Sequence, residues 1–459
     1  MALLIKNGEI VTANGRRRAD VYCEGEQISR IAERIDAPPF VRVVDATGKY
    51  LFPGFVDPHV HAYLPFMGTV TSDDYASVSR AALSGGTTCF IDFVNPGRDE
   101  NPLDAIARWD ERSAGCSACD FSYHIAISRW DDVVERQLRE IVSAGITSFK
   151  IYLAYKGTLA LTDTELFRAL ELAAELNVLT AVHCENAALV DILQQRLLAE
   201  GKCGPEWHYW SRPPIVETLG VQHATTFAEL AGASIYIVHT SCADSLRVAM
   251  DAKLRGVNVS VETCIQYLLL DKQYAEGPGF NAAKYILSPP LREKGNQDAL
   301  WAAVRDGFIN TVATDHAPTN FGTQKSAGRD DFTKITNGLP GVEDRVNLLY
   351  TYGVLKDRIS LERLVDIAST QPARLFGLYP RKGAIAVGSD ADLVVYDPEY
   401  DGIISAETQM TNVDYNPYEG WSISGRPDVV TVRGEIVVEN GAFVGDPVRG
   451  RFLKREKCE

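Results

Sequence analysis

The chain has 459 residues, of which 46% are hydrophobic and 23% charged, the balance of a globular protein with room for a large barrel and a smaller domain. Its net charge of −15 and pI near 5.1 argue against nucleic acid or an anionic membrane as partner, because no basic surface exists to neutralise phosphates. No segment is apolar over the length that a membrane span needs, and nine scattered cysteines predict free thiols in a reducing cytoplasm.

The two ends of the chain have the same kind of sequence, with short strands and turns. Residues 1–52 consist of short apolar runs and turns without a helical pattern, and residues 383–445 do the same. The segment "IKNGEIVTANG" near the start resembles "VRGEIVVENGAFV" near the end. Because barrel termini can lie close in space, we expect both regions to form one small β-sandwich domain. The final residues, 446–459, are polar and are expected to form an extended tail that is free to reach a neighbouring subunit.

Short apolar strands alternate with amphipathic helical stretches through residues 53–382. One such stretch, "LTDTELFRALELAAELN", begins with Thr162 and Glu165 at the spacing of a capping box. Eight strand-and-helix units predict the α/β class and a (β/α)8 TIM barrel. The expected strands are "YLFPGFVD", "TTCFIDF", "FSYHIAI", "SFKIYLA", "LTAVHC", "IYIVHT", "VSVETC" and "NTVATD".

Ionisable residues recur at the ends of these expected strands, where barrels of this type carry their chemistry. His59 and His61 close the first strand, and a spacing of two on an extended chain places both rings on one side. His183, His239 and Asp315 end the fifth, sixth and eighth strands. Four histidines and a carboxylate suit two divalent ions, with zinc as the expected metal.

Lys150 lies within the fourth expected strand, between Phe149 and Ile151. An unpaired ammonium in an apolar interior is costly, and burial lowers the pKa of a lysine. A neutral amine can add carbon dioxide, and the resulting carbamate would bridge two metal ions as an anionic ligand. The alternative is an ion pair between Lys150 and either Glu185 or Asp57.

The other histidines are assigned simpler roles. His124 is expected in the core, His208 and His223 at the surface, and His316 beside the proposed ligand Asp315.

Eight segments occur together in this chain: "GFVDPHVH", "SFKIYLAYKG", "AVHCEN", "VHTSC", "LSPPLR", "ATDHAP", "TNGLPGVEDR" and "LFGLYPRKGAIAVGSDADLVVYDP". They resemble the cyclic amidases of the amidohydrolase superfamily, and in particular the bacterial D-hydantoinases and dihydropyrimidinases. The resemblance extends over nearly the whole chain.

The resemblance implies a division of the metal ligands. His59, His61 and Asp315 would bind the more buried metal, His183 and His239 the more exposed one, and carboxylated Lys150 both.

The resemblance also implies a mechanism. A hydroxide between the metals would attack the ring carbonyl, and Asp315 would pass its proton to the leaving nitrogen. Tyr155 would stabilise the oxyanion. Ser288 and Asn337 would hold the cyclic amide or imide, largely through backbone groups.

By the same resemblance, Leu64, Phe66 and Tyr152 belong to an apolar gate for the group outside the substrate ring. The alternative is that these side chains only pack the loop. An apolar gate favours alkyl and aryl substituents over the polar tail that an allantoinase substrate carries. The residues directly after His61 are Ala62, Tyr63 and Leu64. By resemblance, dihydroorotases have an arginine there that holds the substrate carboxylate, and this chain has none.

The expected product is an N-carbamoyl amino acid, formed from a 5-substituted hydantoin or a 5,6-dihydropyrimidine. The expected partner is this small cyclic amide, with neither nucleic acid nor membrane, and the resemblance implies a homotetramer. Another cyclic amidase activity, or a metal-free scaffold protein related to dihydropyrimidinase, remains the alternative.

Overall fold

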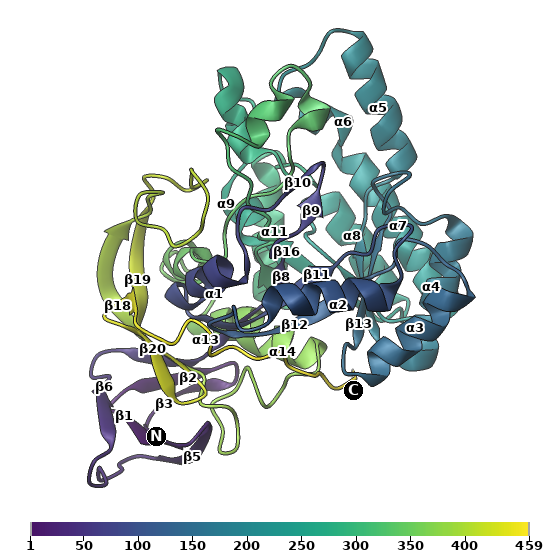
Figure 1. Cartoon of the computed structure of the whole chain (residues 1–459). Helices are drawn as coiled ribbons and strands as arrows, with labels where there is room; N and C mark the ends of the chain where they lie inside the picture. The colour runs from purple at the N-terminus through teal and green to yellow at the C-terminus, as the bar shows by residue number, and fades with distance from the viewer. Residues whose placement is uncertain (1, 458–459) are drawn as a thin grey trace.

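The computed structural model describes residues 2–457 and contains an eight-stranded parallel sheet that is rolled into a barrel (Figure 1). Neighbouring strands follow one another in chain order, and a bridge between Val60 and His316 brings the two edges together. This confirms the predicted α/β class and barrel. The strands are β8 (Phe55–Val60), β11 (Thr87–Val94), β12 (Asp120–Ala126), β13 (Ser148–Tyr152), β14 (Leu179–His183), β15 (Ile235–Ile237), β16 (Val259–Cys264) and β17 (Thr311–Ala313).

The first expected strand, residues 50–57, is in fact two strands that belong to different sheets. Strand β7 (Tyr50–Pro53) pairs with the C-terminal strand β18, whereas β8 enters the barrel. Gly54 lies at the crossing, where an added Cβ would come within 2.1 Å of the Thr88 hydroxyl oxygen. A continuous apolar run concealed this break, although Pro53 and Gly54 are its local signal.

Helices follow the barrel strands and cover the outside of the sheet (Figure 1). The predicted capping box is confirmed, because the Thr162 hydroxyl accepts from the Glu165 N–H while the Glu165 carboxylate accepts from the Thr162 N–H. The helices are α1 (Tyr75–Ser84), α2 (Pro102–Ser113), α3 (Asp132–Ser143), α4 (Asp163–Leu176), α5 (Ala187–Ala199), α6 (Trp207–Ser211), α7 (Pro214–Ala231), α8 (Ala243–Leu254), α9 (Ile265–Leu269), α10 (Lys272–Ala275), α11 (Gly295–Asp306), α12 (Arg345–Leu348), α13 (Leu361–Val365) and α14 (Gln371–Leu375). The 3-10 helices are η1 (Gly279–Tyr285), η2 (Lys325–Gly328) and η3 (Phe332–Lys334), and the π-helical segments are η4 (Leu349–Val354) and η5 (Asp366–Thr370).

Both ends of the chain build a second, β-rich part, as expected. Its seven-stranded sheet has the order β21-β20-β19-β18-β7-β2-β3 and therefore mixes strands from the two ends; a four-stranded sheet has the order β5-β4-β1-β6. Apolar side chains of both sheets share one core, which includes Leu3, Ile5, Leu393 and Val395. The strands are β1 (Ala2–Lys6), β2 (Glu9–Thr12), β3 (Gly15–Arg18), β4 (Asp20–Glu24), β5 (Gln27–Ala32), β6 (Arg42–Asp45), β18 (Leu393–Ile403), β19 (Ser422–Val432), β20 (Glu435–Glu439) and β21 (Ala442–Phe443).

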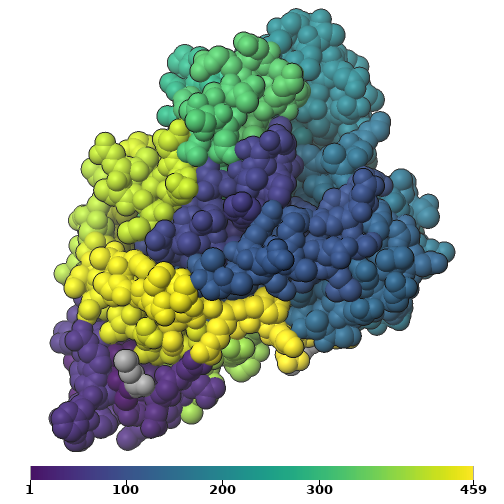
Figure 2. Space-filling model, viewed as in Figure 1, coloured from purple at the N-terminus to yellow at the C-terminus, as the bar shows by residue number. Residues whose placement is uncertain are grey.

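The described end of the expected tail lies along the barrel of its own chain. In Figure 2 the yellow C-terminal residues contact both the purple N-terminal strands and the blue barrel segments. The Leu453 N–H donates to the Phe121 carbonyl (2.7 Å), and the Glu456 N–H donates to the Gly377 carbonyl (3.0 Å). These bonds attach the tail to the start of β12 and to the turn after α14.

Two further expectations concern membrane spans and thiols. Within residues 2–457, no helix has both the length and the apolar character needed to cross a membrane. The eight cysteines in that range are all free thiols.

Candidate active site

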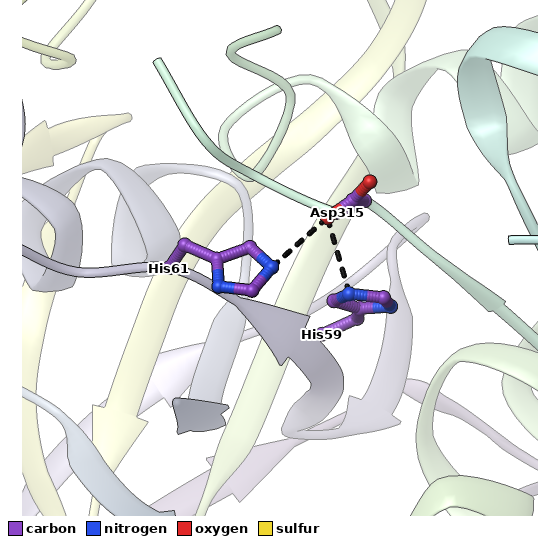
Figure 3. A group of neighbouring side chains, drawn as sticks. All are labelled: His59, His61 and Asp315. Carbon is purple, nitrogen blue, oxygen red and sulfur yellow. Dashed lines mark ion pairs between the residues drawn. The ribbon is translucent and has the colours of Figure 1, made fainter. Parts of the chain in front are cut away.

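His59, His61 and Asp315 meet at the mouth of the barrel (Figure 3). His59 belongs to β8, His61 follows it directly, and Asp315 lies two residues beyond β17. The Nε2 atoms of both rings are 3.1 Å from Oδ1 of Asp315. In Figure 3 the other carboxylate oxygen of Asp315 points away from both rings. The predicted pairing of the two imidazoles on one side of the strand is therefore present.

His183, His239 and Lys150 face the same place from the neighbouring strands. His183 ends β14, His239 lies two residues beyond β15, and Lys150 is the central residue of β13. The rings of His183 and His239 are 4.6 Å apart between centroids, and the rings of His59 and His239 are 5.5 Å apart. All three side chains line one pocket with His59, His61 and Asp315.

Three residues of this region have a left-handed backbone, which is uncommon for residues other than glycine. The φ angles are 66° at Tyr155, 40° at His239 and 49° at Asp315. Such conformations cost free energy and persist where surrounding structure holds them, often at functional sites. Each occurs just after a barrel strand, where the chain turns and directs a polar side chain into the mouth.

Two buried glutamates hold the histidine rings from behind, and the sequence analysis missed both roles. Nδ1 of His59 donates to Glu262 (2.7 Å), and Nε2 of His183 donates to Glu185 (2.8 Å). A carboxylate can only accept, so these bonds place the ring proton and leave Nε2 of neutral His59 and Nδ1 of neutral His183 as lone pairs. The local signal for Glu262 was a charged residue within the buried strand "VSVETC".

Burial and neighbouring charges set the protonation of the site. Burial lowers the pKa of His61 to about 4 and lowers the pKa values of His183 and His239, so these rings are neutral at neutral pH. Burial also opposes charge on His59, but Glu262 and Asp315 outweigh it and raise the His59 pKa to about 9. Burial would raise the pKa of Asp315, yet His59 and His61 hold it well below its ordinary value.

The donor set fits divalent cations. With a pKa of about 9, His59 carries a proton on both ring nitrogens at neutral pH, and its Nε2 donates to Oδ1 of Asp315 (3.1 Å). A divalent cation bound here would take the place of that Nε2 proton, because a neutral imidazole and a carboxylate are both acceptors. Nδ1 of His61 and Nδ1 of His239 are buried without a hydrogen-bond partner among the described residues. Neutral imidazoles and a carboxylate are ligands that suit zinc.

Lys150 is buried, and no carboxylate in the described part of the chain lies within 4.0 Å of its Nζ. Burial lowers its pKa to about 8. Among residues 2–457 neither alternative ion pair, with Glu185 or with Asp57, is present, and each carboxylate has other partners. Glu185 accepts from His183 and Arg212, and Asp57 accepts from the Thr314 hydroxyl (2.7 Å) and the His59 N–H (3.1 Å).

The remaining residues named from the sequence lie around the same pocket, which encloses about 490 Å³ including its open part. The Phe66 ring meets the Tyr155 ring edge-on at 5.3 Å, and the Tyr152 and Tyr155 rings are 6.0 Å apart. Burial raises the pKa of Tyr155 to about 12, so its hydroxyl keeps its proton. The lining includes Leu64, Phe66, Tyr152, Tyr155, Ser288 and Asn337.

The other histidines divide as follows. His124 is a core residue as predicted, with its ring stacked 4.5 Å from Phe93. His316 is buried behind Asp315 and donates from Nε2 to Asp73 (2.9 Å). The surface prediction for His208 is wrong, because Nε2 donates to the Leu287 carbonyl (2.8 Å) and the ring is buried. His223 is partly exposed and faces Asp163.

Comparison with known proteins places this site in a family. The Amidohydrolase family model matches residues 50–437. A D-hydantoinase from Geobacillus stearothermophilus is 46% identical over 458 residues, covering 100% of this chain and 97% of that protein. The solved structure of a D-hydantoinase (dihydropyrimidinase) from Thermus sp. is 55% identical, covers 99% of each chain and has a TM-score of 0.98. That of a dihydropyrimidinase from Brevibacillus agri is 46% identical, with full coverage of each and a TM-score of 0.99. The chain therefore belongs to the amidohydrolase family, within the group of D-hydantoinases and dihydropyrimidinases.

Proposed function

We propose that this protein is a cyclic amidase that hydrolyses 5-substituted hydantoins or 5,6-dihydropyrimidines to N-carbamoyl amino acids. The observation that carries the proposal is the convergence of four histidines, Asp315 and Lys150 on one pocket that also contains a protonated tyrosine. Membership of the family and similarity to named D-hydantoinases support it.

Two divalent ions, with zinc as the expected metal, would be held by the residues of this pocket. His59, His61 and Asp315 would form one set of ligands, and His183 and His239 the other. Lys150, carboxylated by carbon dioxide, would belong to both sets; its burial with no carboxylate of residues 2–457 within 4.0 Å of Nζ supports this role. When bound, the ions supply a water nucleophile at neutral pH and polarise the substrate carbonyl.

Asp315 is suited to proton transfer. Oδ1 faces the two histidines, which leaves Oδ2 to accept a proton from the attacking water and return it to the leaving ring nitrogen. Tyr155 keeps its proton at neutral pH, so its hydroxyl can donate to the oxygen on which negative charge develops.

Substrate selection would depend on the side chains that line the pocket around the proposed metal ligands. Ser288 and Asn337 would hold the ring amide, with backbone groups as the main contacts. Leu64, Phe66 and Tyr152 would contact the substituent outside the ring. An apolar wall accepts alkyl and aryl groups but separates them weakly, since one methylene changes binding by about 1–3 kcal/mol. We further propose a cytoplasmic homotetramer.

A substrate panel tests the proposed function. Turnover efficiency should be compared for dihydrouracil, both enantiomers of 5-phenylhydantoin, allantoin and dihydroorotate on one metal-analysed preparation. We expect the first two classes to be the better substrates. Highest efficiency with allantoin or dihydroorotate would contradict the argument from the apolar wall. A protein with less than one metal per subunit, inactive after addition of zinc and bicarbonate, would favour a scaffold.

A further inference from the structure

Lys325 is a second buried lysine, and it lies outside the pocket lined by the histidines. It begins the 3-10 helix η2 and is fully buried. Within residues 2–457, no carboxylate lies within 4.0 Å of its Nζ. Nζ instead donates to three backbone carbonyls, those of Ile286 (3.2 Å), Thr336 (2.8 Å) and Gly338 (3.0 Å). Burial lowers the pKa of Lys325 to about 7, and in its charged form the three carbonyls use all three N–H groups in place of the water that burial removed.

These carbonyls belong to two chain segments that border the pocket. Thr336 and Gly338 flank Asn337, and Ile286 lies two residues before Ser288. The Gly338 N–H also donates to the Ile286 carbonyl (3.0 Å), so the two segments contact each other directly as well as through Nζ. Lys325 therefore bonds both segments that carry the proposed amide-holding residues.

The direction of these bonds matters for substrate binding. In a trans peptide the C=O and N–H groups point in opposite directions. Because the Thr336 carbonyl points to Nζ, the Asn337 N–H points away from Lys325. Asn337 and Gly338 line the pocket whereas Lys325 does not, so the segment lies between the ammonium and the pocket. The lysine thus fixes the orientation of backbone groups on the pocket side without touching the pocket itself.

We propose that Lys325 is a positioning residue for substrate binding, which acts by holding the segments around Ser288 and Asn337 in a fixed relative orientation. The role of those two residues rests on the proposed function. A buried amine, charged or neutral, is an expensive way to fill space, because an apolar side chain of similar size would avoid its desolvation. The lysine is justified by the carbonyl orientation that it imposes, since a methionine at this position would leave the Thr336 and Gly338 carbonyls without this donor and the Ile286 carbonyl with the Gly338 N–H alone.

The test replaces Lys325 by methionine, which keeps the length and removes the donors, and by glutamine, which keeps an uncharged donor. Lys356→Met, at an exposed lysine, is the matched control. For dihydrouracil we expect K325M to raise KM ~10-fold, the effect of about one lost hydrogen bond on orientation. We expect kcat to change by less than ~3-fold and bound metal to stay at the wild-type level. K325Q should raise KM less than K325M.

Amide hydrogen exchange provides a second readout that does not depend on activity. Residues 286–288 and 336–338 should exchange faster in K325M than in wild type or K356M. Unchanged KM and unchanged exchange would overturn the inference, as would a parallel fall in kcat, metal content and substrate affinity, because that pattern indicates general damage. If wild type hydrolysed neither hydantoins nor dihydrouracil, the proposed function would fail. The exchange comparison would still decide whether Lys325 holds the two segments in place. Should K325M not fold, K325Q carries the same comparison.

Discussion

Glu262→Gln is the perturbation that tests how the buried metal site is built. Oε1 of Glu262 accepts from Nδ1 of His59 (2.7 Å) and from the His239 N–H (2.8 Å), while Oε2 accepts from the Tyr236 hydroxyl (2.7 Å). The carboxylate is fully buried. Glutamine preserves the shape and one acceptor, but it removes the charge that would hold the His59 proton on Nδ1 when a metal ion takes the place of the Nε2 proton.

The expected size of the effect follows from these bonds. A hydrogen bond to a charged partner contributes about 1.5–3 kcal/mol, against about 1 kcal/mol for a neutral one. Loss of the charge therefore weakens the support of His59 by about 0.5–2 kcal/mol, which is about 2- to 30-fold in an equilibrium constant. This agrees with the roughly 10- to 100-fold loss of metal affinity seen when partners of ligating histidines are changed.

Zinc affinity should be measured by competition with a chelator, in parallel with kcat/KM and thermal unfolding. We expect E262Q to lose ~10-fold in zinc affinity at the site formed by His59, His61 and Asp315 while the fold remains intact. Glu229→Gln, at an exposed position on α7, is the control and should match wild type. Wild-type zinc affinity in E262Q would refute the view that this glutamate orients His59.

Three further predictions concern Lys150 and the apolar wall. Lys150→Ala should abolish hydrolysis and most metal binding, with partial recovery on adding short-chain carboxylates; a variant with wild-type rate would exclude a bridging role. Because burial lowers the pKa of Lys150 to about 8, the uncharged amine becomes more abundant as pH rises toward 8. Reactivation of metal-free protein by zinc and bicarbonate should therefore accelerate up to that pH and then level off at constant dissolved CO2, and a pH-independent rate would count against carbamate formation. Phe66→Ala should lower kcat/KM for 5-phenylhydantoin about 5- to 30-fold relative to dihydrouracil, which lacks the aryl group; an equal effect on both substrates would show that Phe66 only packs the loop.

Local sequence carried much of the site because its geometry is local. A spacing of two on a strand is enough to place His59 beside His61, and the ends of parallel strands necessarily meet at one mouth of a barrel. The order of His183, His239 and Asp315 at successive strand ends therefore predicted their convergence. The capping box at Thr162 succeeded for the same reason, since its partners are three residues apart.

The remaining features depended on contacts between residues far apart in the chain. His59 and Glu262 are 203 positions apart, and no periodicity relates them. His208 appeared to be a surface residue until the fold brought the Leu287 carbonyl to its ring. Whether Lys150 paired with Glu185 or Asp57 could be decided only from the fold, in which neither carboxylate lies within 4.0 Å of Nζ. Sequence patterns predict which face of an element is buried, whereas the packing of the whole barrel determines the partner of a buried polar group. The three backbone carbonyls that accept from Lys325 are the clearest example.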